Sequence, residues 1–289
     1  MRIAFVGSEA FAALPFTLSE AGHELTHLFG PATSIATHVT GAMAEESSGV
    51  RWEHTSVTRE KIEGIHRSGA DLILCAGYPH RLDVRPGDPI PALNYHPSPL
   101  PEGRGPSPIA WAILSGREST AVTFHEMVER FDAGPIVLQR ELKIGPGETT
   151  PSLDSRTRQL GVEMVLELVA NFDELWLNRE PQGEGTFCPL PRREDRTLDL
   201  AGPVAQIDRV LRAFTPGNVF VSVAGKAWVV FDAVCWPERH DFPGGSEISR
   251  NGGRRLLAAS DGYVLLRSAL PERVARLRFA AGRLKRFVR

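Results

Sequence analysis

The stretch RIAFVG, residues 2–7, is a short and almost continuous apolar run that ends in glycine. A second run of the same kind, DLILCAG, occupies residues 71–77. Strands that are buried on both faces of a parallel sheet show this continuous pattern rather than an alternating one. Segments with a helical pattern, such as REKIEGIHRSG, lie between and after the runs. This alternation predicts an α/β domain with a Rossmann-like open parallel sheet.

A third strand is predicted at ALNYH, residues 92–96. Ligands bind at the carboxyl ends of the strands in this architecture, so polar side chains at the end of this strand are candidate functional residues. The turn after the first strand, GSEAF, contains one glycine and lacks the G-x-G-x-x-G pattern that cradles a dinucleotide pyrophosphate. A nicotinamide-dependent dehydrogenase is therefore excluded.

The distribution of charge predicts two folded parts. Residues 1–188 contain 15 basic and 25 acidic side chains, whereas residues 189–289 contain 18 basic and 10 acidic ones. We expect a first domain at 1–185, a proline-containing linker at 186–200 and a basic second domain at 201–289. In the second domain, a helix around VAQIDRVLRAF precedes short strands separated by Gly and Asp-Gly turns. This pattern predicts a small OB-like β-barrel.

Two segments have the apolar periodicity of amphipathic helices. The first begins near Thr150, has Pro151 in its first turn, and is predicted to pack on the sheet of the first domain. The second is the C-terminal stretch 273–289, which has seven basic and no acidic residues. Its apolar positions are Leu277, Ala281, Leu284 and Val288, and we expect this face to dock while the charges stay solvated.

Several classes of protein are disfavoured by simple patterns. No apolar run approaches the ~20 residues of a membrane span, and the N-terminus becomes polar too soon for a secretory signal, so a cytoplasmic protein is expected. Three distant cysteines favour neither a disulfide framework nor a metal clip. The motif HELTH, residues 23–27, matches a zinc-protease pattern, but it leads into a predicted strand, where its two histidines would be ~13 Å apart. We therefore expect no metal.

Asn94 and His96 lie two positions apart on the predicted strand, so their side chains point to the same face. A carboxamide beside an imidazole can polarise a carbonyl oxygen or hold the oxyanion that forms when a nucleophile adds to it. Asp132 is a candidate carboxylate partner, because its short polar loop joins two predicted strands, AVTFHEM and IVLQRELKI. No serine triad, cysteine pair or phosphate loop accompanies these residues.

The segments NYHPSPLPEGRGPSPIAWAIL and VTFHEMVERFDAGPIV, taken together, resemble the signature of the 10-formyltetrahydrofolate-dependent formyltransferases. The Asn, the His, the Ser-x-Leu-Pro loop, the Arg-Gly and the distant Asp-Ala-Gly recur in that order. Two departures from the family pattern are Pro99 in the loop and EGRG where an aromatic residue commonly precedes the arginine. They concern the acceptor side of the site.

The resemblance implies a role for each matching residue. The catalytic residues would be Asn94, His96 and Asp132, with Asn94 and a protonated His96 stabilising the oxyanion while an acceptor amine attacks the formyl carbon directly. The co-substrate would be 10-formyltetrahydrofolate. Its folate contacts would be Gly77, Tyr78, Pro79, Val128, Arg130 and Phe131, and the acceptor contacts would be Ser98, Arg104 and Gly105.

The acceptor is expected to be the amine of a small metabolite. Residues 31–50 contain no lysine or arginine, and polyphosphate binding depends on such charges, so tRNA is disfavoured at the active site. A nucleotide-linked amino sugar is the first choice, with a homodimer implied by the resemblance in that case. An N-hydroxyornithine-type siderophore precursor is the second choice.

Two alternatives stay open. The basic C-terminal stretch and the resemblance of the second domain keep methionyl-tRNA formyltransferase as one of them. The other is a protein without catalysis that binds folate or a metabolite on the same fold, although such a protein has no need for all three of Asn94, His96 and Asp132.

Overall fold

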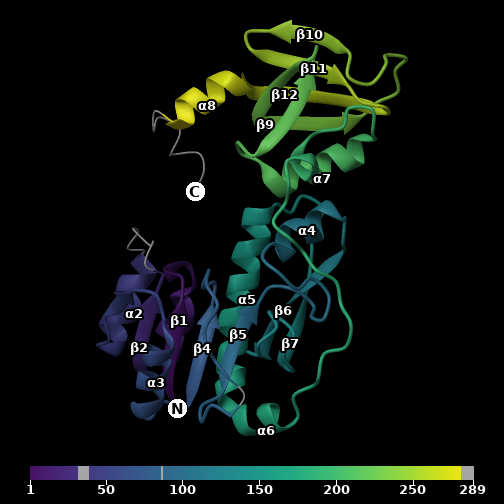
Figure 1. Ribbon diagram of the computed structural model, residues 1–289. Helices are drawn as coiled ribbons and strands as arrows, with labels where there is room; N and C mark the ends of the chain where they lie inside the picture. Colours follow the sequence, from purple (N-terminus) through teal and green to yellow (C-terminus); the bar gives the residue numbers. More distant parts are fainter. Residues whose placement is uncertain (32–38, 86, 281–289) are drawn as a thin grey trace. The chain divides into compact units, whose positions relative to one another are not determined.

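The computed structural model describes residues 1–31, 39–85 and 87–280. The chain forms two compact units, drawn in Figure 1. The first unit comprises Met1–Pro108, Ser119–Lys143 and Asp154–Cys188, and the second comprises Ile109–Glu118, Ile144–Leu153 and Pro189–Arg289. The linear boundaries expected from the sequence, 1–185, 186–200 and 201–289, stay a prediction.

A seven-stranded sheet forms the centre of the first unit. Its order is β3-β2-β1-β4-β5-β6-β7, in which the first five strands are parallel and β6 and β7 are antiparallel to their neighbours. The strands are β1 (Arg2–Gly7), β2 (Glu24–Gly30), β3 (Trp52–His54), β4 (Leu72–Ala76), β5 (Ala92–His96), β6 (Ser119–Glu126) and β7 (Ile136–Lys143). The order 3-2-1-4-5 of the parallel part confirms the predicted Rossmann-like sheet.

Helices cover both faces of this sheet. The helices are α1 (Ala13–Glu20), α2 (Val39–Ser48), α3 (Arg59–Arg67), α5 (Thr150–Ala170) and α6 (Phe172–Leu177), with a 3-10 turn η1 (Glu9–Phe11). Residues of α1, α2 and α5 share one buried cluster with Leu93 and Tyr95 of β5. Residues of α3 share a second cluster with Ala92 of the same strand. Because side chains alternate along a strand, Asn94 and His96 lie on the α3 side, the same side as Ala92.

The long helix predicted from Thr150 is confirmed as α5. Leu160, Met164 and Leu168 are buried in the core of the first unit, because they follow one another along a single face of the helix. The motif HELTH runs into β2, so its second histidine lies on a strand as predicted. All three cysteines are free thiols.

The second unit contains a five-stranded antiparallel sheet in the order β10-β11-β12-β9-β8. This sheet confirms a small β domain, and β10 is a strand that the sequence analysis missed. The strands are β8 (Val219–Val223), β9 (Lys226–Pro237), β10 (Glu247–Asn251), β11 (Arg254–Ala258) and β12 (Gly262–Pro271). The helical elements are α4 (Pro108–Leu114), η2 (Glu194–Arg196), α7 (Val204–Phe214) and α8 (Glu272–Ala280).

The described part of the predicted C-terminal helix is α8. Leu277 is 72% exposed there, so this residue of the expected docking face is not covered. Ala281, Leu284 and Val288 lie outside the described residues. Within the described part of the chain, no helix has the length and apolar character that crossing a membrane requires.

Candidate functional site

Asn94 and His96 stand at the carboxyl end of β5, on the face that carries Ala92. The antiparallel neighbour β6 places His125 directly opposite Asn94 and Thr123 opposite His96. Paired residues of neighbouring strands project to the same side of a sheet. Two strands therefore bring an amide and two imidazoles to one place, and the rings of His96 and His125 are 6.2 Å apart between centroids.

Asp132 reaches this place from the loop between β6 and β7. Its backbone has φ 53°, in the left-handed region that residues other than glycine seldom adopt. The loop turns tightly enough that a Cβ on Gly134 would come within 1.9 Å of the Glu126 carbonyl oxygen, so only glycine fits there. The Gly105 backbone N–H donates to Asp132 Oδ2 at 2.8 Å and holds the carboxylate.

The second carboxylate oxygen of Asp132 faces all three neighbouring side chains. Asp132 Oδ1 lies 3.5 Å from Asn94 Nδ2, 3.6 Å from His96 Nδ1 and 3.6 Å from His125 Nε2. The carboxylate side chain is only 11% exposed. The structure thus brings together the three residues expected to be catalytic, although their roles stay a prediction.

His96 is held in one protonation form by its surroundings. His96 Nε2 lies 2.9 Å from the Gly103 carbonyl oxygen, and a carbonyl only accepts hydrogen bonds, so Nε2 carries the ring proton. Burial lowers the pKa of His96, and this effect outweighs the opposing influence of Asp132. At neutral pH the ring is therefore neutral, with the Nδ1 lone pair directed toward Asp132. The role of a protonated His96 in stabilising the oxyanion, which the resemblance implies, stays a prediction.

Asp132 is ionised. Burial by itself would raise its pKa, but the contacts with His125, His96 and the Gly105 N–H outweigh burial and lower it. The site therefore combines a carboxylate, a neutral base and an amide that donates hydrogen bonds. Such a set can receive a proton and stabilise a developing oxyanion without any covalent intermediate.

His125 was missed by the sequence analysis. It is 2% exposed, and the signal that could have found it is its alternation with Thr123 in the strand VTFHEM. That alternation shows that both residues share a face, but not that this face is the one with Asn94. The pairing register of β5 and β6 decides the matter, and it is a property of the folded sheet.

The residues expected to contact the acceptor are largely buried. Ser98 is 2% exposed and Arg104 6% exposed. The Arg104 guanidinium donates to Gln182 Oε1 and to the Gly183 carbonyl. Gly105 contributes its N–H to Asp132, as described above. Arg104 thus has partners within the protein, and the acceptor roles of Ser98, Arg104 and Gly105 stay predictions.

Gln182 is a second residue that the sequence analysis missed. Its Nε2 donates to the backbone carbonyls of Asp132 at 3.0 Å and Gly134 at 2.6 Å, while its Oε1 accepts from Arg104. It joins the Asp132 loop to the loop after β5, which is 78 residues away in sequence. No local pattern marks a glutamine for such a role.

The residues expected to contact folate fall into two groups. Tyr78 is partly buried, and its hydroxyl accepts the Val57 N–H at 3.0 Å, whereas Gly77 and Pro79 beside it are exposed. On the loop after β6, Val128 is 37% exposed and Phe131 62% exposed, and Arg130 is exposed as well. Tyr78 thus already has a partner, while the residues of the loop after β6 are open to a ligand.

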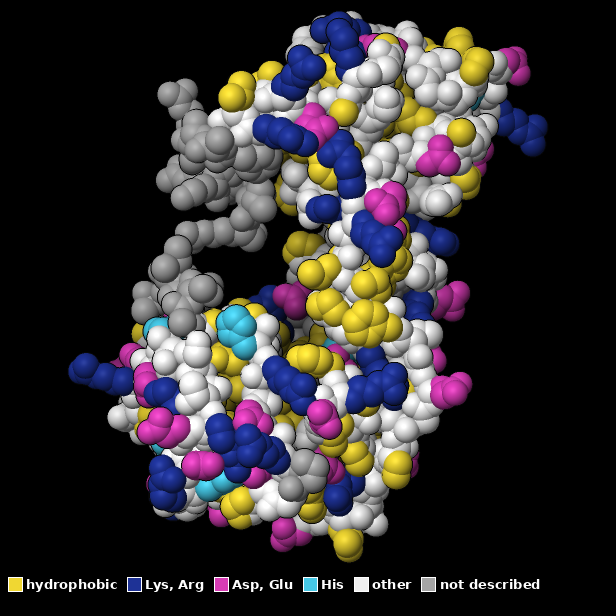
Figure 2. Space-filling view, in the orientation of Figure 1, with side chains coloured by type: hydrophobic (Ala, Val, Ile, Leu, Met, Phe, Trp, Pro, Cys, Tyr) yellow, Lys and Arg dark blue, Asp and Glu magenta, His cyan; other side chains and the backbone are white. Residues whose placement is uncertain are grey.

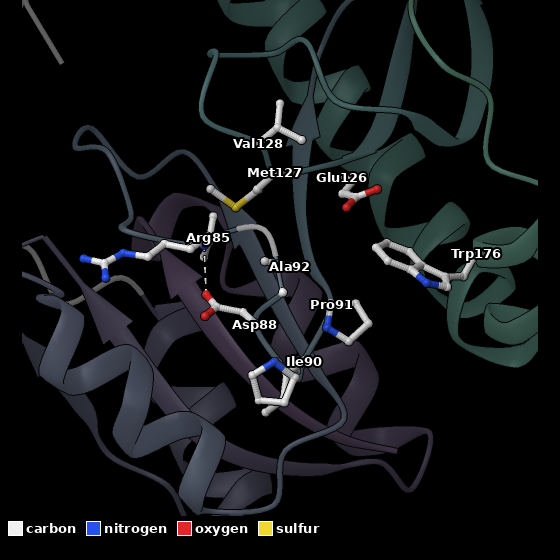
Figure 3. Close-up of a pocket in the computed structure, with 12 residues that line it drawn as sticks. Arg85, Asp88, Ile90, Pro91, Ala92, Glu126, Met127, Val128 and Trp176 are labelled. Carbon is white, nitrogen blue, oxygen red and sulfur yellow. Dashed lines mark hydrogen bonds between the residues drawn. The ribbon is translucent and has the colours of Figure 1, made fainter.

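A pocket of about 350 Å³ lies beside these loop residues (Figure 3). Met127 and Val128 form one wall, and Trp176 lies opposite Arg85 and Asp88. Ala92 of β5 also lines it, two residues before Asn94 and on the same face. The pocket is thus on the same side of β5 as the polar cluster.

The wall that carries Asp88 is held firmly. Arg59 of α3 binds both carboxylate oxygens of Asp88 at 2.7 and 2.8 Å and also donates to the Asp83 carbonyl. The Arg85 backbone N–H donates to the same carboxylate at 2.9 Å.

In residues 1–31, 39–85 and 87–280, no group of three or more His, Cys, Asp or Glu side chains is placed to hold a metal ion.

Comparisons with known proteins agree with this architecture. The family model described as formyl transferase matches residues 20–169. Methionyl-tRNA formyltransferase of Thermotoga neapolitana is 32% identical over 265 residues, which are 84% of this chain and 82% of that protein. The protein of the same name from Roseiflexus castenholzii is 30% identical over 287 residues, with 94% and 91% covered.

Solved structures show the same fold. HypX of Aquifex aeolicus, in complex with tetrahydrofolic acid, has a TM-score of 0.65 at 23% identity, covering 99% of this chain and 48% of HypX. The chain thus spans about half the length of HypX. A 4-N formyltransferase of Francisella tularensis has a TM-score of 0.64 at 18% identity, covering 80% of this chain and 96% of that one.

The family match covers the strands and loops that carry Asn94, His96 and Asp132. It includes both segments that carry the resemblance to the formyltransferases, residues 94–114 and 122–137. The chain therefore belongs to the formyl transferase family, that of the 10-formyltetrahydrofolate-dependent formyltransferases.

Proposed function

We propose that this protein transfers the formyl group of 10-formyltetrahydrofolate to the amine of a small metabolite, with a nucleotide-linked amino sugar as the first acceptor class. The observation that carries the proposal is the cluster of Asn94, His96 and Asp132, in which an amide donor, a neutral base and an ionised carboxylate converge. The cluster suits direct attack by a nucleophile that the acceptor brings. In this proposal, residues 1–185 form the catalytic domain.

In the proposed reaction, the acceptor nitrogen attacks the formyl carbon and a carbon–nitrogen bond forms. The electron pair of the carbonyl moves onto its oxygen, where Asn94 Nδ2 donates a hydrogen bond to the oxyanion. The lone pair of His96 Nδ1 takes the proton that the amine loses, and Asp132 stabilises the resulting imidazolium. His96 then returns the proton to N10 of the folate as the bond from N10 to the formyl carbon breaks, which releases tetrahydrofolate.

The pocket beside Ala92 is proposed to hold the pterin end of the folate. It is lined by Val84, Ala92, Met127 and Val128, which offer apolar surface to a planar ring. Ala92 and Asn94 are two residues apart on β5, a separation of roughly 7 Å. A folate in the pocket could therefore place its formyl group beside Asn94. Val128, Arg130 and Phe131 would contact the folate from the loop after β6.

The charge of the first part of the chain supports a small acceptor. Residues 1–188 carry 25 acidic against 15 basic side chains, and residues 31–50 carry no lysine or arginine. A protein that holds tRNA at its active site needs lysine and arginine contacts to phosphates. An N-hydroxyornithine-type precursor is the next acceptor class, since it also presents an amine without a polyphosphate backbone.

Methionyl-tRNA is the second candidate acceptor, and specific observations favour it. The relatives from Thermotoga neapolitana and Roseiflexus castenholzii bear that activity in their names at 30–32% identity. Residues 189–289 have 18 basic against 10 acidic side chains. Figure 2 shows a row of Lys and Arg side chains, broken by a few acidic ones, on the visible face of the second unit.

The test is release of tetrahydrofolate from 10-formyltetrahydrofolate in the presence of each acceptor class, with His96→Ala as the control. Turnover on an amino sugar nucleotide that His96→Ala abolishes would support the proposal. Turnover on methionyl-tRNA alone would overturn the acceptor. Tight folate binding without turnover on any acceptor would indicate a binding protein.

A further inference from the structure

His125 is a buried polar side chain of the site, and the proposed reaction does not use it. Its Nδ1 lies 2.9 Å from the Glu126 carbonyl oxygen. A carbonyl oxygen only accepts hydrogen bonds, so Nδ1 carries a proton. The other nitrogen, Nε2, then has a lone pair and acts as an acceptor.

The nearest partner of that lone pair is the carboxamide of Asn94. The distance from Asn94 Nδ2 to His125 Nε2 is 3.2 Å, within hydrogen-bond range. An acceptor at this position selects the NH2 group of the amide and excludes its oxygen. One N–H of Asn94 is thereby used by His125, and the amide plane is fixed. The same Nδ2 lies 3.5 Å from Asp132 Oδ1, so the second N–H is directed to the side of the site where that carboxylate lies.

We propose that His125 is a positioning residue that orients the Asn94 carboxamide, so that the second Nδ2–H points to the formyl oxygen in the transition state. This inference rests on the proposed role of Asn94 as the oxyanion donor. Without His125 the amide would keep its 3.5 Å contact with Asp132 but lose the shorter one, and it could rotate more easily to present its own oxygen to the oxyanion. His125 acts through Asn94 and does not touch the substrate.

Asp132 is the alternative group through which His125 could act. His125 Nε2 lies 3.6 Å from Asp132 Oδ1, which exceeds hydrogen-bond distance. The geometry therefore favours Asn94 over Asp132 as the partner of His125.

Two amide substitutions separate the functions of the two ring nitrogens. His125→Gln places a carboxamide near the position of Nε2 and retains a hydrogen-bond acceptor for Asn94. His125→Asn places the carboxamide near Nδ1, so Asn94 loses its acceptor. We expect His125→Asn to lower kcat by roughly 100-fold, as for a group misplaced by ~1 Å, and His125→Gln to restore much of the loss. KM for the folate should stay within about threefold in both variants, because His125 does not line the pocket. His27→Asn, a change of the same type on β2, should leave kcat unchanged.

A double-mutant cycle tests whether the effect runs through Asn94. In an Asn94→Ala background, His125→Asn should have almost no further effect on kcat, because the group that it orients is gone. In an Asp132→Asn background, the loss caused by His125→Asn should persist. Circular dichroism and urea unfolding show that each variant is folded before its kinetics are compared.

The outcomes also separate this inference from the proposed function. If the wild-type protein transfers formyl groups and Asn94→Ala impairs transfer, the proposed function holds. A His125→Asn loss that is undiminished in Asn94→Ala, or a His125→Gln variant no better than His125→Asn, would then overturn the positioning role alone. If Asn94→Ala has normal kcat, the role of Asn94 fails, and the inference on His125 fails with it.

Discussion

The Asn94 side chain contacts two neighbouring polar groups of the site. It is paired with His125 across the sheet and lies 3.5 Å from Asp132, so its amide can be oriented by one neighbour while it serves the reacting oxygen. Preorganisation of this kind lowers the barrier because the donor does not have to reorient during the reaction.

Substitution Asn94→Ala should lower kcat by about 100–1,000-fold, the usual effect of removing one oxyanion donor. KM should change much less, since the hydrogen bond strengthens mainly in the transition state. Steady-state kinetics of tetrahydrofolate release measures both constants. The matched control is Asn251→Ala on exposed β10, which should behave as wild type. A similar loss in both variants would argue against the role of Asn94.

His96 makes stability depend on pH. Burial lowers its pKa below the usual 6.5, so the unfolded chain takes up this proton at a higher pH than the folded protein does. The free energy of unfolding therefore falls as the pH drops through and below ~6.5. His96→Gln has no imidazole at this position and lacks this pH-dependent contribution. The difference in unfolding free energy between wild type and variant should therefore shrink from about pH 7.5 to about pH 5.5. Urea unfolding at several pH values measures it, and a constant difference would refute the expectation.

The loops that hold the site are connected to one another by side chains from distant elements. Arg104, Gln182 and the Asp132 loop form one such connection, in which Gln182 uses both its acceptor and its donors. Asp132 keeps its left-handed backbone conformation with this support. A conformation that costs energy by itself persists where its surroundings determine it.

Gln182→Met should release the Asp132 loop. It removes two hydrogen bonds to the loop carbonyls and the acceptor of the buried Arg104 guanidinium. We expect a loss of about 1–3 kcal/mol in the free energy of unfolding and a decrease in kcat of roughly 10–100-fold. Urea unfolding and steady-state kinetics measure the two effects. Gln159→Met, at an exposed position of α5, should have neither.

Val128→Trp should obstruct the pocket. The larger side chain would occupy space between Met127 and the opposite wall, so KM for 10-formyltetrahydrofolate should rise at least about tenfold, as for an interaction lost by ~1.4 kcal/mol. Val274→Trp is the matched control, because Val274 of α8 is 38% exposed and Val128 is 37% exposed. Unchanged folate KM in Val128→Trp would place the folate elsewhere.

At the scale of the whole molecule, the uneven charge makes the salt dependence of turnover diagnostic. A small acceptor makes few contacts to phosphates, so its KM should change only modestly between about 50 and about 200 mM salt. A tRNA held by 6–10 phosphate contacts would instead lose about 1,000–100,000-fold in affinity over that range. Measuring KM for both acceptors at several salt concentrations tests the proposed acceptor, and a steep slope on the productive acceptor would contradict it.

Much of the architecture could be predicted from local patterns. The runs at 2–7, 71–77 and 92–96 became β1, β4 and β5, because a continuous apolar run can be satisfied only by burial on both faces. The short strand β3 and the strand β10 were missed. β3 has three residues, of which two are exposed, and β10 is polar along most of its length, so neither shows the apolar pattern of a buried strand.

By itself, the sequence determined that Asn94 and His96 share a face, since their spacing of two on a strand requires it wherever the strand lies. The tertiary structure alone decided that His125 lies opposite Asn94, that Gln182 holds the Asp132 loop, and that burial leaves His96 neutral. Strand alternation and apolar periodicity are properties of neighbouring residues and can be read locally. Pairing register, contacts across 78 residues and exclusion of water arise only when distant segments pack together.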